Sequence, residues 1–250
     1  MRKLIFLPLV FSLLIFGIPN VMAQSKTVSV APFEKIIVSP HVEVTLQQGN
    51  EEAVVIENAE VPFEKINIKV EGKTLRIYLD GAKMNTRSER IKEEDWKGRR
   101  SIYRGTMVTA TITYKTLNKL SVRGEETVRC ESPIEQKDFN LTIYGESKVY
   151  FNSFTLKNLT ATIYGESYLE IENGEVNHQK YITYGESEVN TLGMTNNATK
   201  ITAYGESDFK VNVSDRLKVT SFGEAEINFE GNPEVDKGIV LGEVKIRKIG

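Results

Sequence analysis

A pair of glycine and glutamate recurs at nearly constant spacing through the second half of this chain. Successive glycines are separated by 21, 20, 20, 20, 18 and 19 residues. The pairs are Gly124-Glu125, Gly145-Glu146, Gly165-Glu166, Gly185-Glu186, Gly205-Glu206, Gly223-Glu224 and Gly242-Glu243. Four of them belong to the longer string Tyr-Gly-Glu-Ser, at residues 144–147, 164–167, 184–187 and 204–207. A fixed period in this range is typical of repeat proteins, whose units are too small to bury an apolar face alone and therefore stack.

Within one repeat, apolar or small residues alternate with polar ones. A period of two places one set of side chains inward and leaves the other set in solvent. The inward set of the first full copy is Leu141, Ile143, Gly145, Ser147 and Val149. Tyr144 and Glu146 then face outward, unless the glycine sits at a corner that reverses the alternation and buries the tyrosine. The pattern predicts an all-β fold, a right-handed parallel β-solenoid with coils of about 20 residues. Glycine suits the sharp bends between the strands of a coil.

The chain before the repeats also alternates. Short runs at residues 36–38, 42–46, 53–56, 66–70 and 75–79 predict strands, separated by turn residues. We therefore expect an N-terminal β-sheet region over 24–116 and the repeat β-solenoid over 117–250.

Residues 81–105 interrupt this alternation with a dense mixture of basic and acidic side chains. The segment is predicted to be a solvated loop or a short helix. The alternative interpretation is a basic contact surface for an anionic glycan or a membrane, anchored by Trp96.

The first 23 residues have the pattern of a secretory signal peptide. Arg2 and Lys3 precede an apolar run at 4–18, and small residues at 21–23 form a cleavage site. A membrane anchor is the alternative, but the run contains Pro8 and is shorter than the roughly 20 residues of a spanning helix. We expect a mature chain beginning at Gln24, exported to the periplasm or cell surface, with no membrane span after signal cleavage.

The charge and the cysteine content of the chain argue against a nucleic-acid partner and against an intramolecular disulfide. Removal of the signal would change the net charge from −2 to −4, and a mildly acidic chain does not indicate a nucleic-acid partner. Cys130 is the single cysteine, so an intramolecular disulfide is impossible. Its place in a strand pattern predicts a buried free thiol.

The chain resembles the bacterial family described as putative auto-transporter adhesin, head GIN domain. The similarity lies in residues 33–38, 42–49, 117–122, 227–233 and 242–246, together with the glycines that precede short strands. This chain carries Gly-Glu-Ser where the family more often has small residues or a second glycine. The resemblance implies a β-solenoid, export and an adhesin-like role, and it leaves the ligand open.

Stacked coils would align the tyrosines and the glutamates of the four full copies. The candidate ligand-binding residues are Tyr144, Glu146, Tyr164, Glu166, Tyr184, Glu186, Tyr204 and Glu206. The tyrosines could form a platform for sugar rings, with carboxylates accepting hydroxyl hydrogen bonds, or could simply stabilise neighbouring strands. Two carboxylates about 5 Å apart repel by roughly 0.8 kcal/mol in water. The glutamates could therefore recruit Ca²⁺ or another hard cation, or remain a solvated row; whether a metal binds is left open.

No catalytic constellation or cofactor motif is evident. His41 and His178 are isolated in sequence, and no nucleophile is identifiable near them. The sequence favours an exported, non-catalytic binding or structural module of the cell envelope, with a glycan or an envelope protein as partner. The alternative is a carbohydrate-active enzyme that uses carboxylates on the solenoid face. The strand-like residues 240–249 could also leave an unpaired edge for a homo-oligomer.

Overall fold

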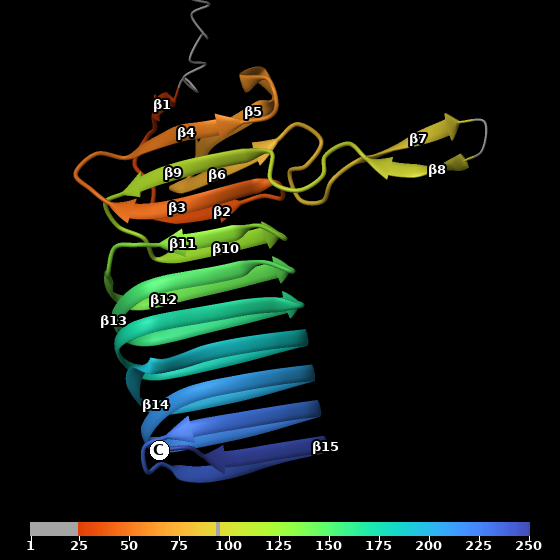
Figure 1. Cartoon of the computed structure of the whole chain (residues 1–250). Helices are drawn as coiled ribbons and strands as arrows, with labels where there is room; N and C mark the ends of the chain where they lie inside the picture. Colours follow the sequence, from red (N-terminus) through yellow and green to blue (C-terminus); the bar gives the residue numbers. More distant parts are fainter. Residues whose placement is uncertain (1–24, 94–95) are drawn as a thin grey trace, which may run out of the picture.

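The computed structural model describes residues 25–93 and 96–250 of the 250-residue chain (Figure 1). The signal peptide predicted at residues 1–23 lies outside the described residues. Within the described ranges, no helix is long and apolar enough to cross a membrane.

The fold is one 13-stranded sheet wound into a solenoid, with a separate two-stranded hairpin (Figure 1). Strands make up 76% of the structure. The N-terminal elements are β1 (Lys26–Ser29), β2 (Lys35–Val38), β3 (Val42–Gln48), β4 (Ala53–Ala59), the 3-10 turn η1 (Phe63–Lys65), β5 (Ile66–Glu71), β6 (Thr74–Leu79), β7 (Ser88–Glu93), β8 (Trp96–Ser101) and β9 (Val108–Tyr114). The remaining elements are β10 (Lys119–Gly124), β11 (Thr127–Cys130), β12 (Ile134–Gly145), β13 (Lys148–Gly165), β14 (Ser167–Glu230) and β15 (Glu234–Lys248). The five N-terminal strands predicted from alternation are confirmed.

Successive coils pair in parallel and in register. β12 pairs with β13 so that Tyr144 lies opposite Tyr164 and Gly145 lies opposite Gly165. The same 20-residue offset places Tyr164 opposite Tyr184 in the pairing of β13 with β14. Strand geometry continues through most corners, so the 64 residues of β14 wind through several coils. The predicted parallel solenoid with coils of about 20 residues is confirmed.

The stack of coils continues into the N-terminal region. β10 pairs in parallel with β2 as well as with β12, and β11 pairs in parallel with both β3 and β13. The sheet therefore runs across the boundary expected at residue 117. Antiparallel pairs of β4 with β9, β5 with β6 and β1 with β4 complete this end of the sheet. These strands cover the first coil, whose edge would otherwise be open to pairing with another chain.

The charged segment 81–105 is not a loop or a short helix as predicted. It contains the antiparallel hairpin of β7 and β8, which projects from the side of the solenoid (Figure 1). Its sequence lacks the apolar alternation that identifies a half-buried strand, and Ser88, Glu89 and Arg90 of β7 are exposed. The side chain of Trp96 lies outside the described part of the structure.

The core fills the space between the walls of the coil. Leu141, Ile143 and Val149 are at most 1% exposed, as the alternation predicted. Phe139, Phe151 and Phe154 pack against one another at ring-centroid distances of 4.6 to 5.7 Å. Cys130 is buried, as predicted.

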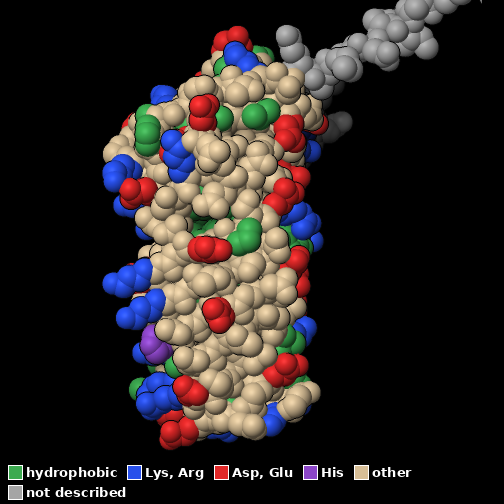
Figure 2. All heavy atoms as spheres, turned by 90° about the vertical axis from the view of Figure 1, so that its left-hand side faces the viewer, with side chains coloured by type: hydrophobic (Ala, Val, Ile, Leu, Met, Phe, Trp, Pro, Cys, Tyr) green, Lys and Arg blue, Asp and Glu red, His purple; other side chains and the backbone are tan. Residues whose placement is uncertain are grey.

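Charge is unevenly distributed over the outer surface. In Figure 2, Lys and Arg side chains and a histidine follow one another down the left edge of the solenoid. Carboxylates dominate the region beside the glycine corners, which holds the candidate site.

Candidate functional site

The string Gly-Glu-Ser forms a corner of the coil. Gly165 has φ of +108°, and a Cβ placed on it would lie 2.3 Å from the carbonyl oxygen of Gly145 in the preceding coil. Only glycine fits both this backbone angle and this close approach. Ser167 points inward and donates a hydrogen bond from Oγ to the same Gly145 oxygen at 2.9 Å. Glu166 is exposed. The corner therefore turns the chain with glycine, anchors it with serine and leaves the glutamate in solvent.

The tyrosines of the four full copies form a continuous stack, which we call the tyrosine ladder: Tyr144, Tyr164, Tyr184 and Tyr204, followed by Phe222. Neighbouring ring centroids are 4.8 to 4.9 Å apart, and the ring planes differ by 2 to 5°. This distance is the spacing of adjacent strands. In-register pairing of the coils therefore brings these predicted site residues together.

The ladder exposes ring edges rather than ring faces. Each inner ring is covered on both faces by its neighbours, and the guanidinium of Arg123 lies 4.5 Å above the ring of Tyr144 at one end. The side chains of Tyr164, Tyr184 and Tyr204 are still 36 to 39% exposed. The tyrosines are thus not buried by a change of alternation at the corner. Sugar rings cannot stack on the covered ring faces, so a ligand would meet the ring edges and the hydroxyl groups.

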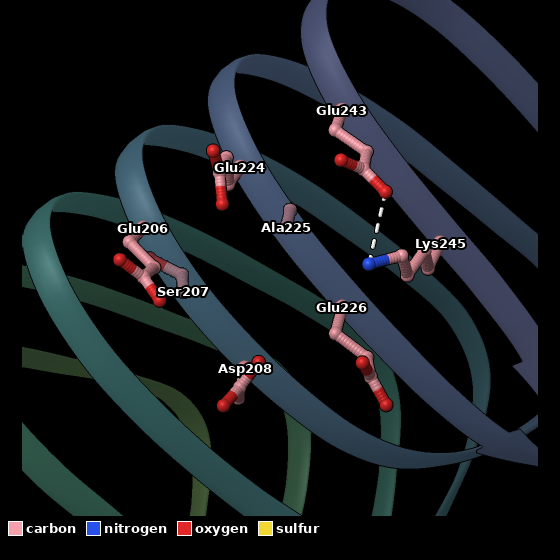
Figure 3. Close-up of a pocket in the computed structure, with 8 residues that line it drawn as sticks. All are labelled: Glu206, Ser207, Asp208, Glu224, Ala225, Glu226, Glu243 and Lys245. Atoms are coloured by element: carbon pink, nitrogen blue, oxygen red, sulfur yellow. Dashed lines mark ion pairs between the residues drawn. The ribbon is translucent and has the colours of Figure 1, made fainter.

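The four glutamates of the repeats line one groove of about 340 Å³ beside the ladder. We call it the acidic groove; its carboxylates are those of Glu146, Glu166, Glu186, Glu206, Glu188 and Asp208. A second hollow, shown in Figure 3, continues it along the next coils and contains Glu224, Glu226 and the ion pair of Glu243 with Lys245 at 2.9 Å. The structure therefore places all eight predicted site residues on neighbouring coils, with the glutamates sharing one groove.

A second row of acids was missed in the sequence. Glu188, Asp208 and Glu226 each lie three residues after a corner glycine, and they project beside the first row. The sequence contains the pattern that predicts this row, because the third position after the corner glycine carries an acid in three consecutive copies. Burial and the neighbouring Glu226 and Glu188 carboxylates raise the pKa of Asp208, while Lys210 opposes the shift. A raised carboxyl pKa is expected where several negative charges are close together.

The acidic groove does not form a recognisable metal centre. In the described residues, no group of three or more His, Cys, Asp or Glu side chains is arranged to hold a metal ion. Hard cations need several oxygen ligands converging on one point. Here the carboxylates follow a row along the coils instead.

His41 has structural partners that its sequence context did not reveal. Its Nδ1 lies 2.7 Å from the carbonyl oxygen of Gly105 and 3.7 Å from a carboxylate oxygen of Glu126, while its Nε2 lies 2.7 Å from the hydroxyl of Thr86. Glu126 is buried and occupies the position of the repeat serine in the first Gly-Glu pair. These contacts fix both ends of the segment that carries the β7–β8 hairpin.

Comparison of folds places this architecture among bacterial β-solenoid proteins. A putative adhesin from Bacteroides fragilis has 19% sequence identity and a TM-score of 0.75, over 93% of this chain and 100% of that chain. A putative lipid binding protein from Parabacteroides distasonis has 18% identity and a TM-score of 0.65, over 92% and 98% of the two chains. A putative adhesin from Parabacteroides merdae has 15% identity and a TM-score of 0.63, with the same coverage. At these identities the similarity establishes the fold alone.

The family is established by sequence. A family model matches residues 32–233, which is most of the chain. The protein belongs to the family described as putative auto-transporter adhesin, head GIN domain. No curated protein matches its sequence.

Proposed function

We propose that this protein is an exported, non-catalytic, adhesin-like binding module of the bacterial cell envelope, and that its ligand is a glycan contacted by the tyrosine ladder and the acidic groove. The observation that carries the proposal is the exposed row of aromatic edges at 4.8 to 4.9 Å intervals beside a row of carboxylates. Family membership supports an adhesin-like role.

The chemistry of this surface favours a ligand rich in hydroxyl groups. Carboxylates only accept hydrogen bonds, and a phenolic hydroxyl both donates and accepts. Sugar hydroxyls can satisfy both kinds of group. Because each row repeats once per coil, a linear glycan lying along the solenoid axis would meet the same contacts several times. Repeated weak contacts give avidity without a deep pocket.

Tyrosine-to-phenylalanine substitution tests the proposal without disrupting the ladder. Phe222 already stacks on Tyr204 at 4.9 Å, so the stack accommodates phenylalanine. On a glycan array, the variant that combines Tyr164→Phe and Tyr184→Phe should no longer bind the glycans that the unchanged protein binds. Glu166→Gln combined with Glu186→Gln should do the same. The thermal unfolding midpoint should remain within a few degrees for the phenylalanine variant. Glycan binding that survives both double variants would refute the proposed site.

The raised pKa of Asp208 favours one alternative, a carbohydrate-active enzyme. General acid catalysis of glycoside cleavage uses a carboxyl group whose pKa lies above the ordinary value, and burial together with the neighbouring Glu226 and Glu188 raises the pKa of Asp208. Incubation with envelope polysaccharides and measurement of reducing ends separates the two functions. A binding module should release none, whereas release that disappears in Asp208→Asn would establish the enzyme.

A further inference from the structure

A second groove on the solenoid has the opposite charge to the acidic groove. It has a volume of about 480 Å³ and is lined by basic side chains of neighbouring coils: Lys180, Lys200, Lys218, Arg216 and His178. We call it the basic groove. Figure 2 shows Lys and Arg side chains one below another along the left edge of the solenoid. Neither the repeat motif nor the family resemblance pointed to it.

Three lysines of the basic groove form a row in register with the tyrosine ladder. Lys180, Lys200 and Lys218 each precede a ladder ring by four residues, namely Tyr184, Tyr204 and Phe222. Because those rings stack at 4.8 and 4.9 Å, the lysines stand on adjacent coils at the same position of the strand. Residues separated by an even number lie on the same face of a strand. The lysine row and the ladder therefore share one outer face, about 13 Å apart at about 3.3 Å per residue.

The positive charge of this row is only partly compensated. Arg216 and Lys218 share the carboxylate of Asp236, at 2.8 and 3.1 Å. Lys180 and Lys200 are exposed and form no ion pair with any described residue. Like charges on adjacent strands are destabilising. Proteins commonly keep such an unfavourable arrangement of like charges at a functional site, where a ligand of opposite charge can compensate it.

We propose that the basic groove binds the carboxylate or sulfate groups of a linear anionic glycan. Lysine and arginine side chains offer several hydrogen-bond donors to anionic oxygens, and adjacent coils repeat these donors along the direction of a chain. A membrane surface fits less well, because the apolar Leu159 in the lining is only 1% exposed. A nucleic acid is disfavoured by the net charge of −2 and by the acidic groove on the far side of the ladder.

Binding measurements with the full chain test this site. The probes are polygalacturonate, dextran sulfate, uncharged dextran, and vesicles with and without phosphatidylglycerol. We expect binding to at least one of the two anionic glycans, none to dextran, and weaker binding as NaCl screens the charges. Lys180→Gln combined with Lys200→Gln should lower the affinity about tenfold or more. Lys65→Gln combined with Lys83→Gln removes the same charge from exposed positions outside the groove and outside the lysine row, and should leave the affinity nearly unchanged.

The proposal would be overturned by no binding to either anionic glycan, by equal losses in the two lysine double variants, or by binding to anionic vesicles alone. The variant with Tyr164→Phe and Tyr184→Phe separates this site from the tyrosine ladder, since it should retain its affinity for the anionic glycan. Loss of binding in that variant as well would indicate one continuous site and would also contradict an independent basic groove.

Discussion

Ser167 donates a hydrogen bond to the carbonyl oxygen of Gly145, one coil earlier, at 2.9 Å. Ser147 bonds Gly124 and Ser187 bonds Gly165 in the same way, at 2.9 and 3.1 Å. In three of the four copies, the serine of the repeated string thus joins a corner to the one before it, whereas the hydroxyl of Ser207 in the fourth copy lies 2.9 Å from that of Thr183. The glutamate between the glycine and the serine contributes nothing to this side-chain contact and lies at the surface. Within one motif, the serine therefore stabilises the corner, and the neighbouring glutamate is left exposed as a candidate ligand contact.

Removing this hydrogen bond should have a modest cost. In Ser167→Ala we expect a loss of about 1 kcal/mol in the free energy of unfolding, the usual net contribution of one hydrogen bond. The cost is limited because the Gly145 oxygen keeps a second donor, the backbone N–H of Glu166 at 3.0 Å. Thermal unfolding should show a decrease of about 2–4 °C. The exposed Ser88→Ala serves as control, and equal effects in the two variants would contradict the role of the corner serine.

A side chain at the corner glycine should be far more disruptive. Gly165→Ala would place a Cβ 2.3 Å from the Gly145 oxygen, at φ of +108°. We expect a loss of at least about 3 kcal/mol, measured by chemical denaturation, because backbone strain adds to the clash. Gly105 also has a positive φ, +60°, but a Cβ added there would have no atom within 4 Å beyond its chain neighbours. Gly105→Ala should therefore cost only about 1–2 kcal/mol. A similar cost in both would show that the close approach is unimportant.

The pKa of Asp208 predicts a stability change with a definite sign. Burial first, and then Glu226 and Glu188, raise its pKa in the folded state above the ordinary 3.8. The folded state then holds the proton more tightly than the unfolded state, so stability falls as pH rises above that value. Asp208→Asn should raise the unfolding temperature at neutral pH, and the difference should vanish below pH 3.8.

Asp236 provides a control of opposite sign. Hydrogen bonds from Arg216 and Lys218 lower the pKa of Asp236. Its contribution to stability is present above the unfolded pKa of 3.8 and is lost as pH falls through the lowered folded value. Asp236→Asn should therefore lower the unfolding temperature at neutral pH. Shifts of the same direction in Asp208→Asn and Asp236→Asn would contradict this account of the charges.

The thiol of Cys130 should be unreactive in the native protein. Burial raises the pKa of Cys130 from 9.0 to about 11, and its Sγ lies 3.5 Å from the hydroxyl of Tyr114. A protonated thiol is a poor nucleophile. A thiol-specific chromogenic reagent at neutral pH should react only after denaturant is added, with one equivalent per chain. The raised folded pKa also predicts that stability decreases as pH rises above 9.0. Rapid labelling of the native chain would contradict the buried position.

Sequence periodicity was a strong guide to the solenoid and a weak guide to the surface. The alternation around Tyr144 identified the inward residues Leu141 and Ile143, because a strand has two faces and a coil has one inside. The alternation did not predict the β7–β8 hairpin, because apolar and polar residues do not alternate along these two strands. The Tyr-Gly-Glu-Ser motif identified the row of acids that includes Glu206. It did not identify the second row, because Asp208 and its equivalents lie just after the motif.

By itself, the sequence determined the period, the inward and outward side chains and the positions that only glycine can occupy. These properties depend on local backbone geometry and on the regular recurrence of residues. The tertiary structure alone decided that the tyrosine rings cover one another's faces, that the strands before residue 117 extend the same sheet, and that Lys180 and Lys200 stand in a row with no ion-pair partner among the described residues. Those properties depend on the register between coils, which brings together residues that are a full coil apart along the chain.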